Sequence, residues 1–250
     1  MSHSTEHNSR PEQSATPFIA ASETDSNLYY ATRFIAPDPF IYLEVKGERL
    51  MVMSDLEVDR ARNQATVDRV LSYSELERRA KSQGVKDPGT IDVIHLVLQD
   101  AGLKDILVPP TFPFLHASRL QEMGYRLRTK RDPFYEQRVM KSDEEVRHIE
   151  AAQRATETAV AAAHQHLRRA EIRDNVLWLD GEILTSERVK KLINVALMEC
   201  DCVAQHTIVA GGEQACDPHD EGSGPLPAHR SIIFDVLPRA AGTRYFADMS

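Results

Sequence analysis

Short apolar runs alternate with amphipathic helical patterns through the first half of the sequence. Residues 40–45 and 48–53 are rich in β-forming side chains and flank Lys46-Gly47, which predicts a hairpin. Helical spacing of apolar residues follows over 91–101, and another short apolar run occupies 105–108. This alternation predicts an α/β domain, because each helix can cover the sheet that its flanking strands form.

The character of the sequence divides the chain into three parts. Residues 1–24 are mostly Ser, Thr, His, Asn, Glu and Pro, a composition that predicts a disordered tail. The α/β domain is expected over residues 25–138. Ser142 and Glu145 then form a capping-box pattern at the start of a long, Ala-rich helix, and β-like runs come later. A second domain of helices and sheet is therefore expected over residues 139–250.

Charge and composition exclude several classes of function. The sequence has 30 Lys and Arg against 38 Asp and Glu, a net charge of −8, so a nucleic acid or an anionic membrane would be repelled at long range. It lacks an apolar run of the roughly 18 residues that a membrane span requires. Its three cysteines cannot all pair with one another. We therefore expect a reduced, cytoplasmic protein that binds neither nucleic acid nor membrane.

Two carboxylates stand at the ends of apolar runs near the end of the sequence. Asp235 follows 232–234 and Asp248 follows 245–247, with Pro and Gly between them as in a hairpin loop. If the hairpin is centred in Ala240–Thr243, the two aspartates are directly opposed, and a divalent cation would relieve the repulsion of the two charges. The alternative is that one Asp faces solvent or that a β-bulge shifts the register.

Two further groups of side chains could carry chemistry. His219 lies in a loop rich in Gly and Pro and could carry a proton or polarise a carbonyl, although a lone loop His is more often a surface residue. Cys200, Cys202, His206 and Cys216 could be soft metal ligands, but their spacing matches no common zinc pattern, which favours small apolar side chains buried in a β region.

The order of these segments resembles a known family. Three segments, in this order, are similar to the pita-bread metallopeptidases, which include Xaa-Pro aminopeptidases and prolidases. They are the helix segment KSDEEVRHIEAAQRATETAV, then IVAGGEQACDPH, and then IIFDVLPRAAGTRYFADMS. The stretch 25–62 resembles the creatinase-like N-terminal domain of the proline-specific branch. The resemblance implies an α/β creatinase-like N-terminal domain followed by the first part of an α+β pita-bread catalytic domain.

The resemblance also implies roles for particular residues. Asp235 matches the first metal ligand, Asp248 the carboxylate that bridges two metals, and His219 the histidine that contacts the substrate near the scissile carbonyl. Two divalent ions (manganese, cobalt or zinc) are implied, with a metal-bridged hydroxide that releases an N-terminal residue from an Xaa-Pro peptide substrate. The resemblance further implies a homodimer.

The sequence departs from the family pattern at its end. The remaining metal ligands of the family, a His and two Glu, lie beyond the second Asp, and no residue up to Ser250 matches them. We therefore expect the N-terminal part of a longer protein, and no hydrolysis by these 250 residues alone. Two alternatives are a non-catalytic peptide- or protein-binding module on a peptidase scaffold and a creatinase-like C–N hydrolase that uses no metal. The presence of both Asp235 and Asp248 argues against the latter.

Overall fold

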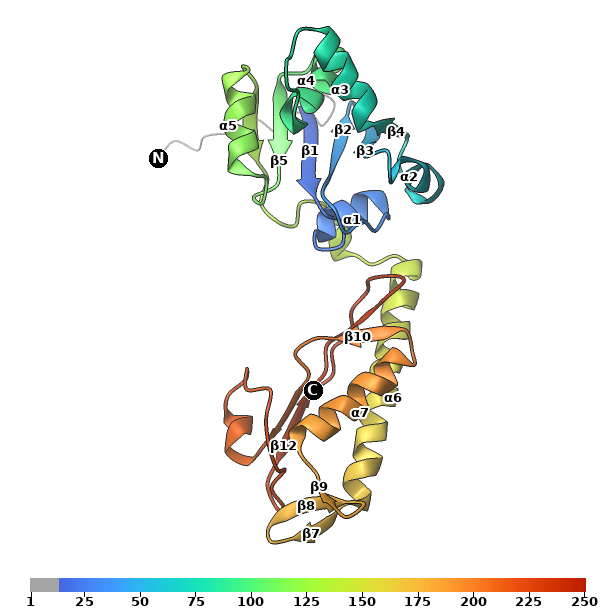
Figure 1. The fold of residues 1–250 in the computed structure, drawn as a ribbon, viewed down its shortest axis with the longest axis vertical. Coiled ribbons are helices and arrows are strands. Elements are labelled where there is room, and N and C mark those ends of the chain that lie inside the picture. Colours follow the sequence, from blue (N-terminus) through green and yellow to red (C-terminus); the bar gives the residue numbers. More distant parts are fainter. Residues whose placement is uncertain (1–13) are drawn as a thin grey trace, which may run out of the picture. The chain divides into compact units, whose positions relative to one another are not determined.

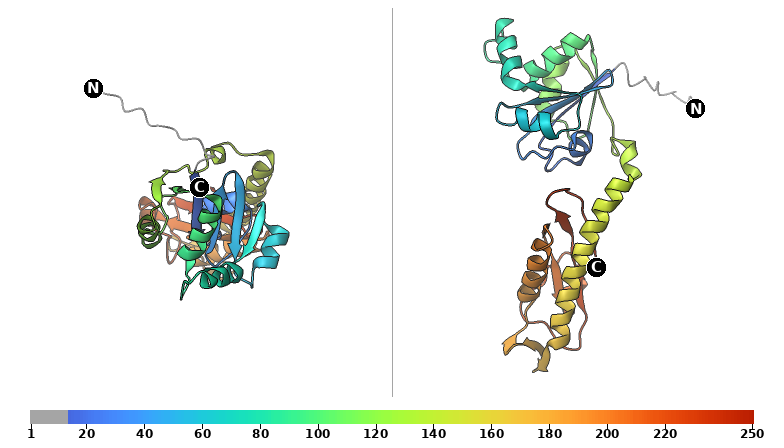
Figure 2. Two further views of the ribbon diagram at one scale, coloured as in Figure 1. Left: turned by 90° about the horizontal axis from the view of Figure 1, so that it is seen from above. Right: turned by 90° about the vertical axis from the view of Figure 1, so that its right-hand side faces the viewer.

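The computed structural model describes residues 14–250 and divides the chain into two compact units (Figures 1 and 2). One unit ends at Val139 and the other begins at Met140.

The first unit is built on a six-stranded sheet with strand order β4-β3-β2-β1-β5-β6. Its strands are β1 (Ser14–Ala20), β2 (Phe40–Val45), β3 (Glu48–Met53), β4 (Arg69–Ser72), β5 (Asp105–Val108) and β6 (Arg126–Thr129). β2 is antiparallel to both of its neighbours, whereas the other adjacent strands pair in parallel. Five strands therefore point the same way, and their carboxyl ends share one edge of the sheet.

Helices cover both faces of this sheet, which can be followed in Figure 2. They are α1 (Ser26–Thr32), α2 (Val58–Gln64), α3 (Tyr73–Ser82), α4 (Thr90–Ala101) and α5 (Phe114–Glu122). One core lies under α3, α4 and α5 and includes Leu43 and Ile106, whereas the other lies under α1 and α2 and includes Phe18 and Tyr42. Because side chains alternate along a strand, β1 to β5 contribute to both cores, whereas the edge strand β6 contributes only Leu127, to the core under α3, α4 and α5.

The first strand corrects the prediction that residues 1–24 are a disordered tail. Ser14–Ala20 forms β1 in the interior of the sheet, where it pairs with β2 over six residues and with β5 at Ser14 and Ala15. Phe18 is buried against the aromatic rings of Tyr42 and Phe134. The prediction failed because the polar composition of residues 1–24 as a whole obscured this short apolar segment. Residues 1–13 of the predicted tail lie outside the described residues.

The turn and cap signals of the sequence are confirmed. Lys46 and Gly47, with φ of 53° and 84°, form the tight turn between β2 and β3, as expected for a two-residue hairpin loop. Ser142 and Glu145 form both bonds of a capping box. A cap of the same kind opens α3, where Ser72, a residue not named above, accepts a hydrogen bond from the backbone N–H of Glu75.

The second unit combines two helices with short strands. Its helices are α6 (Asp143–Arg169) and α7 (Ser186–Met198), together with the 3-10 helix η3 (Gly212–Cys216). Its strands are β7 (Glu171–Arg173), β8 (Val176–Leu179), β9 (Glu182–Ile183), β10 (Cys202–Ala204), β11 (Ile208–Gly211), β12 (Ile232–Asp235) and β13 (Pro238–Ala240). β7, β8 and β9 form one antiparallel sheet, β11 pairs with β12, and β10 pairs with β13.

Strands β10 to β13 are buried on one side by α6 and α7. Ala159 of α6, Ile193 of α7 and Val236, between β12 and β13, belong to the same core. The side chains that alternate with those core residues point the other way. Four apolar ones among them are exposed, Val203, Ile233, Leu237 and Phe246, whereas Ile208 and Ala210 of β11 are buried. We call this side the open face.

The helices within residues 14–250 are each too short or too polar to span a lipid bilayer.

Candidate functional site

The segment that carries Asp235 and Asp248 folds back on itself in a register that differs from the predicted one. Val236 pairs with Met249 and Arg239 with Phe246, so Leu237 lies opposite Asp248. The prediction that the two aspartates are directly opposed is therefore wrong. The cause is the turn: Ala240 pairs with Tyr245 through its backbone, which leaves four residues in the loop and moves its centre by one position.

The altered register still leaves both aspartates on one face. A shift of two residues preserves the alternation of side chains, whereas a shift of one would reverse it. Asp235 and Asp248 are therefore diagonal neighbours on the open face, at about 7 Å by the usual spacing of such pairs. Asp235 is half-buried beside Ile208 of β11, and Asp248 is exposed. The two carboxylates share a solvent-facing surface that a ligand can reach.

These carboxylates do not make a metal centre by themselves. Within residues 14–250, no three His, Cys, Asp or Glu side chains gather closely enough to hold a metal ion. The residues present thus supply two oxygen-donor side chains, fewer than the three or more protein ligands that a catalytic zinc site uses. They do not fit a complete two-metal centre.

A loop anchored by α7 borders the open face. Lys190 of α7 donates hydrogen bonds to the backbone carbonyls of Glu221 and Gly222, and Glu187 accepts one from the N–H of Gly224. The hydrogen bond from Gly224 is the main reason why the pKa of Glu187 is lowered. Gly222 has φ of 77°, and a Cβ there would lie 2.0 Å from the carbonyl oxygen of Val209. Only glycine permits this close approach.

The sequence-predicted His219 lies in this loop. Its side chain is exposed, and its backbone N–H donates to Asp217 Oδ1 at 3.0 Å, an Asx turn that shapes the loop. A proton carrier must be open to solvent or substrate, and His219 meets that requirement. No contact of its imidazole with Asp235 or Asp248 is present in the described structure.

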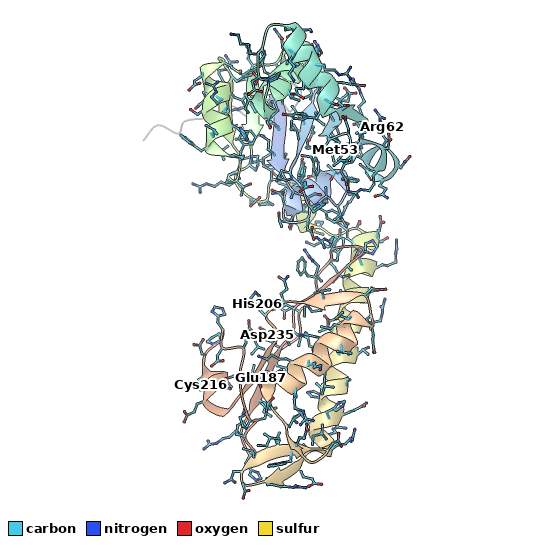
Figure 3. The ribbon with its side chains drawn as sticks, in the orientation of Figure 1. Met53, Arg62, Glu187, His206, Cys216 and Asp235 are labelled. Atoms are coloured by element: carbon cyan, nitrogen blue, oxygen red, sulfur yellow. The ribbon has the colours of Figure 1, made fainter. Side chains whose placement is uncertain are left out.

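The cysteine and histidine residues do not assemble into a soft-metal site. His206 Nδ1 lies 2.7 Å from Glu221 Oε1, so its ring is oriented by a carboxylate. Cys202 is buried, and burial raises the pKa of its thiol, whereas Cys200 and Cys216 are exposed. Figure 3 shows His206 and Asp235 in the second unit, with Cys216 set apart from both at the end of η3. The expectation that these cysteines are all buried holds for Cys202 only.

A cavity of about 720 Å³ lies beside the start of β12. Its walls are the η3 turn, Pro225, Pro227 and Ile233, the last of which precedes Asp235 by two residues on the open face. Two charged side chains line it, Glu213 and Arg230. Neither was singled out from the sequence, where each is one isolated charge in a polar loop.

Comparison with known proteins gives structural likeness without sequence likeness. Neither a protein-family model nor a curated protein matches this chain. The structure is similar to an Xaa-Pro dipeptidase from Bacillus anthracis, with a TM-score of 0.71 and 13% identity over 94% of this chain and 58% of that one. An X-Pro aminopeptidase from Thermotoga maritima MSB8 has a TM-score of 0.69 and 17% identity over 94% of this chain and 60% of that one. For a prolidase from Pyrococcus furiosus the TM-score is 0.68 and the identity 14%, over 94% of this chain and 64% of that one.

This likeness confirms the predicted fold class. The chain has an α/β unit followed by the first part of an α+β pita-bread unit, the fold of the N-terminal portion of these solved structures. It spans about three fifths of the length of each of these three chains.

Proposed function

We propose that this chain is the N-terminal portion of a peptidase that releases an N-terminal residue from Xaa-Pro peptides. The observation that carries the proposal is the likeness to three Xaa-Pro peptidases, which extends over 94% of the chain and therefore over both units. A creatinase-like first unit joined to a pita-bread second unit is the arrangement that the sequence resemblance implied. The three unpaired cysteines are in keeping with a reducing, cytoplasmic location.

Within this proposal, Asp235 and Asp248 are ligands of a site for divalent metal ions, which manganese, cobalt or zinc would occupy. Support comes from their placement as diagonal neighbours on the open face. The other ligands would come from outside these 250 residues. When bound, such ions supply an activated water for attack on the peptide carbonyl. His219 is proposed to contact the substrate, since its exposed loop borders the same unit's open face.

One observation favours a second candidate, a peptide-binding module without catalysis. Among residues 14–250, side chains that could hold a metal ion do not occur in groups of three or more. If the protein ends where this sequence ends, the two aspartates have no further ligands. The open face and the cavity beside it would then bind a peptide without cleaving it.

The intact mass of the protein isolated from its own cells separates the two candidates first. A mass well above 28.2 kDa supports the peptidase, because the chain then includes further residues that can complete the site. A mass near 28.2 kDa favours the binding module.

Hydrolysis of Ala-Pro and Ala-Pro-Ala by the isolated protein then tests the peptidase directly. We expect activity that a chelator removes and added manganese or cobalt restores. Asp248→Asn should lower kcat/KM by more than about a hundredfold, because it removes a charged metal ligand. Asp180→Asn is the matched control, since Asp180 is an exposed turn residue whose only ion pair among residues 14–250 is with Arg169. Unchanged turnover in Asp248→Asn would contradict the metal assignment.

A further inference from the structure

The cavity beside β12 contains two opposite charges that no other side chain neutralises. Arg230 and Glu213 both line it and both are exposed, and neither forms an ion pair or side-chain hydrogen bond in the described part of the chain. An exposed guanidinium is an ordinary surface feature. A guanidinium in the wall of a 720 Å³ cavity next to the candidate site is a binding group for an anion.

The surrounding backbone holds this wall in a fixed shape. A Cβ on Gly211 would lie 2.6 Å from the Pro227 ring, so strand β11 and the proline segment pack without space between them. Gln214 exchanges hydrogen bonds with the backbone and hydroxyl of Ser223, which closes the η3 turn against the loop. The methylene stem of Arg230 lies about 4.0 Å from the position of a Cβ on Gly212. The stem of the arginine thus passes close to Gly212 of the η3 turn.

We infer that Arg230 binds the carboxylate of a short peptide whose apolar part lies on Ile233 and Pro225. The inference rests on the proposed function and deepens it, because it names the substrate class. The guanidinium matches a carboxylate in geometry and charge, and the proline and isoleucine walls suit an apolar ring or side chain.

The spacing along β12 sets the length of this peptide. Ile233 and Asp235 are two residues apart on one face, about 7 Å along the strand. An extended peptide covers about 3.5 Å per residue, so a carboxylate that lies over Ile233 is about two residues beyond a carbonyl that faces Asp235. Arg230 therefore favours dipeptides and tripeptides over longer peptides. The same guanidinium could also take the acidic side chain of a longer peptide.

Glu213 provides a second variant for the test, because its charge is opposite to that of Arg230. A carboxylate bound at Arg230 is repelled by Glu213, so Glu213→Gln should strengthen binding while Arg230→Gln weakens it. A neutral ligand should respond to neither change. A structural role for the two side chains would give no such opposite signs.

Titration calorimetry of the full-length protein with three peptides, in a chelator that stops their hydrolysis, tests the assignment. The probes are Ala-Pro, its C-terminal amide, and Ala-Pro-Glu-amide, which carries its carboxylate on a side chain. We expect Ala-Pro to bind roughly three- to tenfold more tightly than its amide, because its carboxylate forms a partly exposed charge pair with Arg230. Arg230→Gln should remove that preference, Arg230→Lys should retain part of it, and Glu213→Gln should raise it. Arg168→Gln, the same change at an exposed position of α6, should leave the preference for Ala-Pro unchanged.

The outcomes distinguish this inference from the proposed function. Equal binding of Ala-Pro and its amide, or a preference that survives Arg230→Gln, overturns the carboxylate site while the peptidase proposal stands. An Arg230-dependent preference for Ala-Pro-Glu-amide over Ala-Pro supports the carboxylate site with an acidic side chain as its source, and overturns the short-peptide preference. Absence of both binding and hydrolysis for all three peptides contradicts the proposed function and this inference together.

Discussion

In the first unit helices pack on both faces of the sheet, whereas in the second unit α6 and α7 pack on one face of strands β10 to β13. The consequence is visible in adjacent residues. Tyr42 and Leu43 point to opposite faces of β2 and are 1% and 0% exposed, but Val236 and Leu237 are 0% and 40% exposed. The first sheet is thus filled by its own unit. The second presents apolar side chains and two carboxylates on a surface open to ligands or to further protein.

Replacing one isoleucine in each sheet should give the largest difference between the two units in the free energy of unfolding. Ile106→Ala in β5 should lower the free energy of unfolding of the first unit by about 2–5 kcal/mol, because its side chain is fully buried. Ile233→Ala in β12 should lower that of the second unit by less than about 1 kcal/mol, because it is 45% exposed. Urea denaturation can separate the two, since the single tryptophan, Trp178, reports on the second unit and far-UV circular dichroism on both.

The comparison would fail if Ile233→Ala destabilised the second unit as strongly as Ile106→Ala does the first. That outcome would mean that the open face is covered in solution, by another copy or by further chain. Ala241→Gly in the exposed hairpin loop is a control for the second unit, with an expected change of about 1 kcal/mol or less.

A smaller effect is expected at the start of α6. Ser142→Ala removes the hydrogen bond to the N–H of Glu145 and should destabilise the second unit by about 1 kcal/mol. Glu145 also accepts a hydrogen bond from Tyr245 at 2.8 Å, so the cap supports the hairpin that carries Asp248. Thr158→Ala on the exposed side of α6 is the control and should leave the Trp178 transition nearly unchanged. A larger effect from the control would show that helix propensity, not the cap, limits this unit.

The sequence allowed good prediction of features that depend on neighbouring residues. Lys46-Gly47 specifies its turn because few residue pairs adopt positive φ at both positions. Ser142 and Glu145 specify a helix start because both cap bonds are local. The alternation of strands and helices likewise led to the correct fold class.

Features that depend on distant residues could not be predicted in the same way. β1 is stabilised by β2, β5 and the ring of Phe134, more than a hundred residues from Phe18. Its short apolar run begins with Pro17 and follows a mostly polar stretch, so the local sequence does not indicate an interior strand. The register of Asp235 and Asp248 depends on how many residues the turn retains, which the sequence Ala240–Thr243 leaves open. Arg230 and Glu213 are brought to one cavity by the loop that joins η3 to β12. No local pattern links them.

The smallest expected difference between the units is in their response to acid. In the first unit, hydrogen bonds lower the pKa values of four aspartates. The main donor is Ser74 for Asp55 and the backbone of Arg49 for Asp68. It is the side chain of Arg79 for Asp100 and that of Arg126 for Asp105. A carboxylate whose pKa is lower in the folded state stabilises that state above its unfolded pKa, 3.8 for Asp, and the stabilisation is lost as the pH falls through the folded pKa.

Below about pH 4 the urea midpoint of the first unit should therefore fall faster than the Trp178 transition, although the second unit also has a lowered pKa at Glu187. The effect should be modest and should shrink in high salt, because these carboxylates are near the surface. Asp100→Asn should remove part of the pH dependence in the first unit alone, since it takes away the partner of Arg79. A Trp178 transition that falls as steeply as that of the first unit would show that acid acts on the second unit through groups other than Glu187.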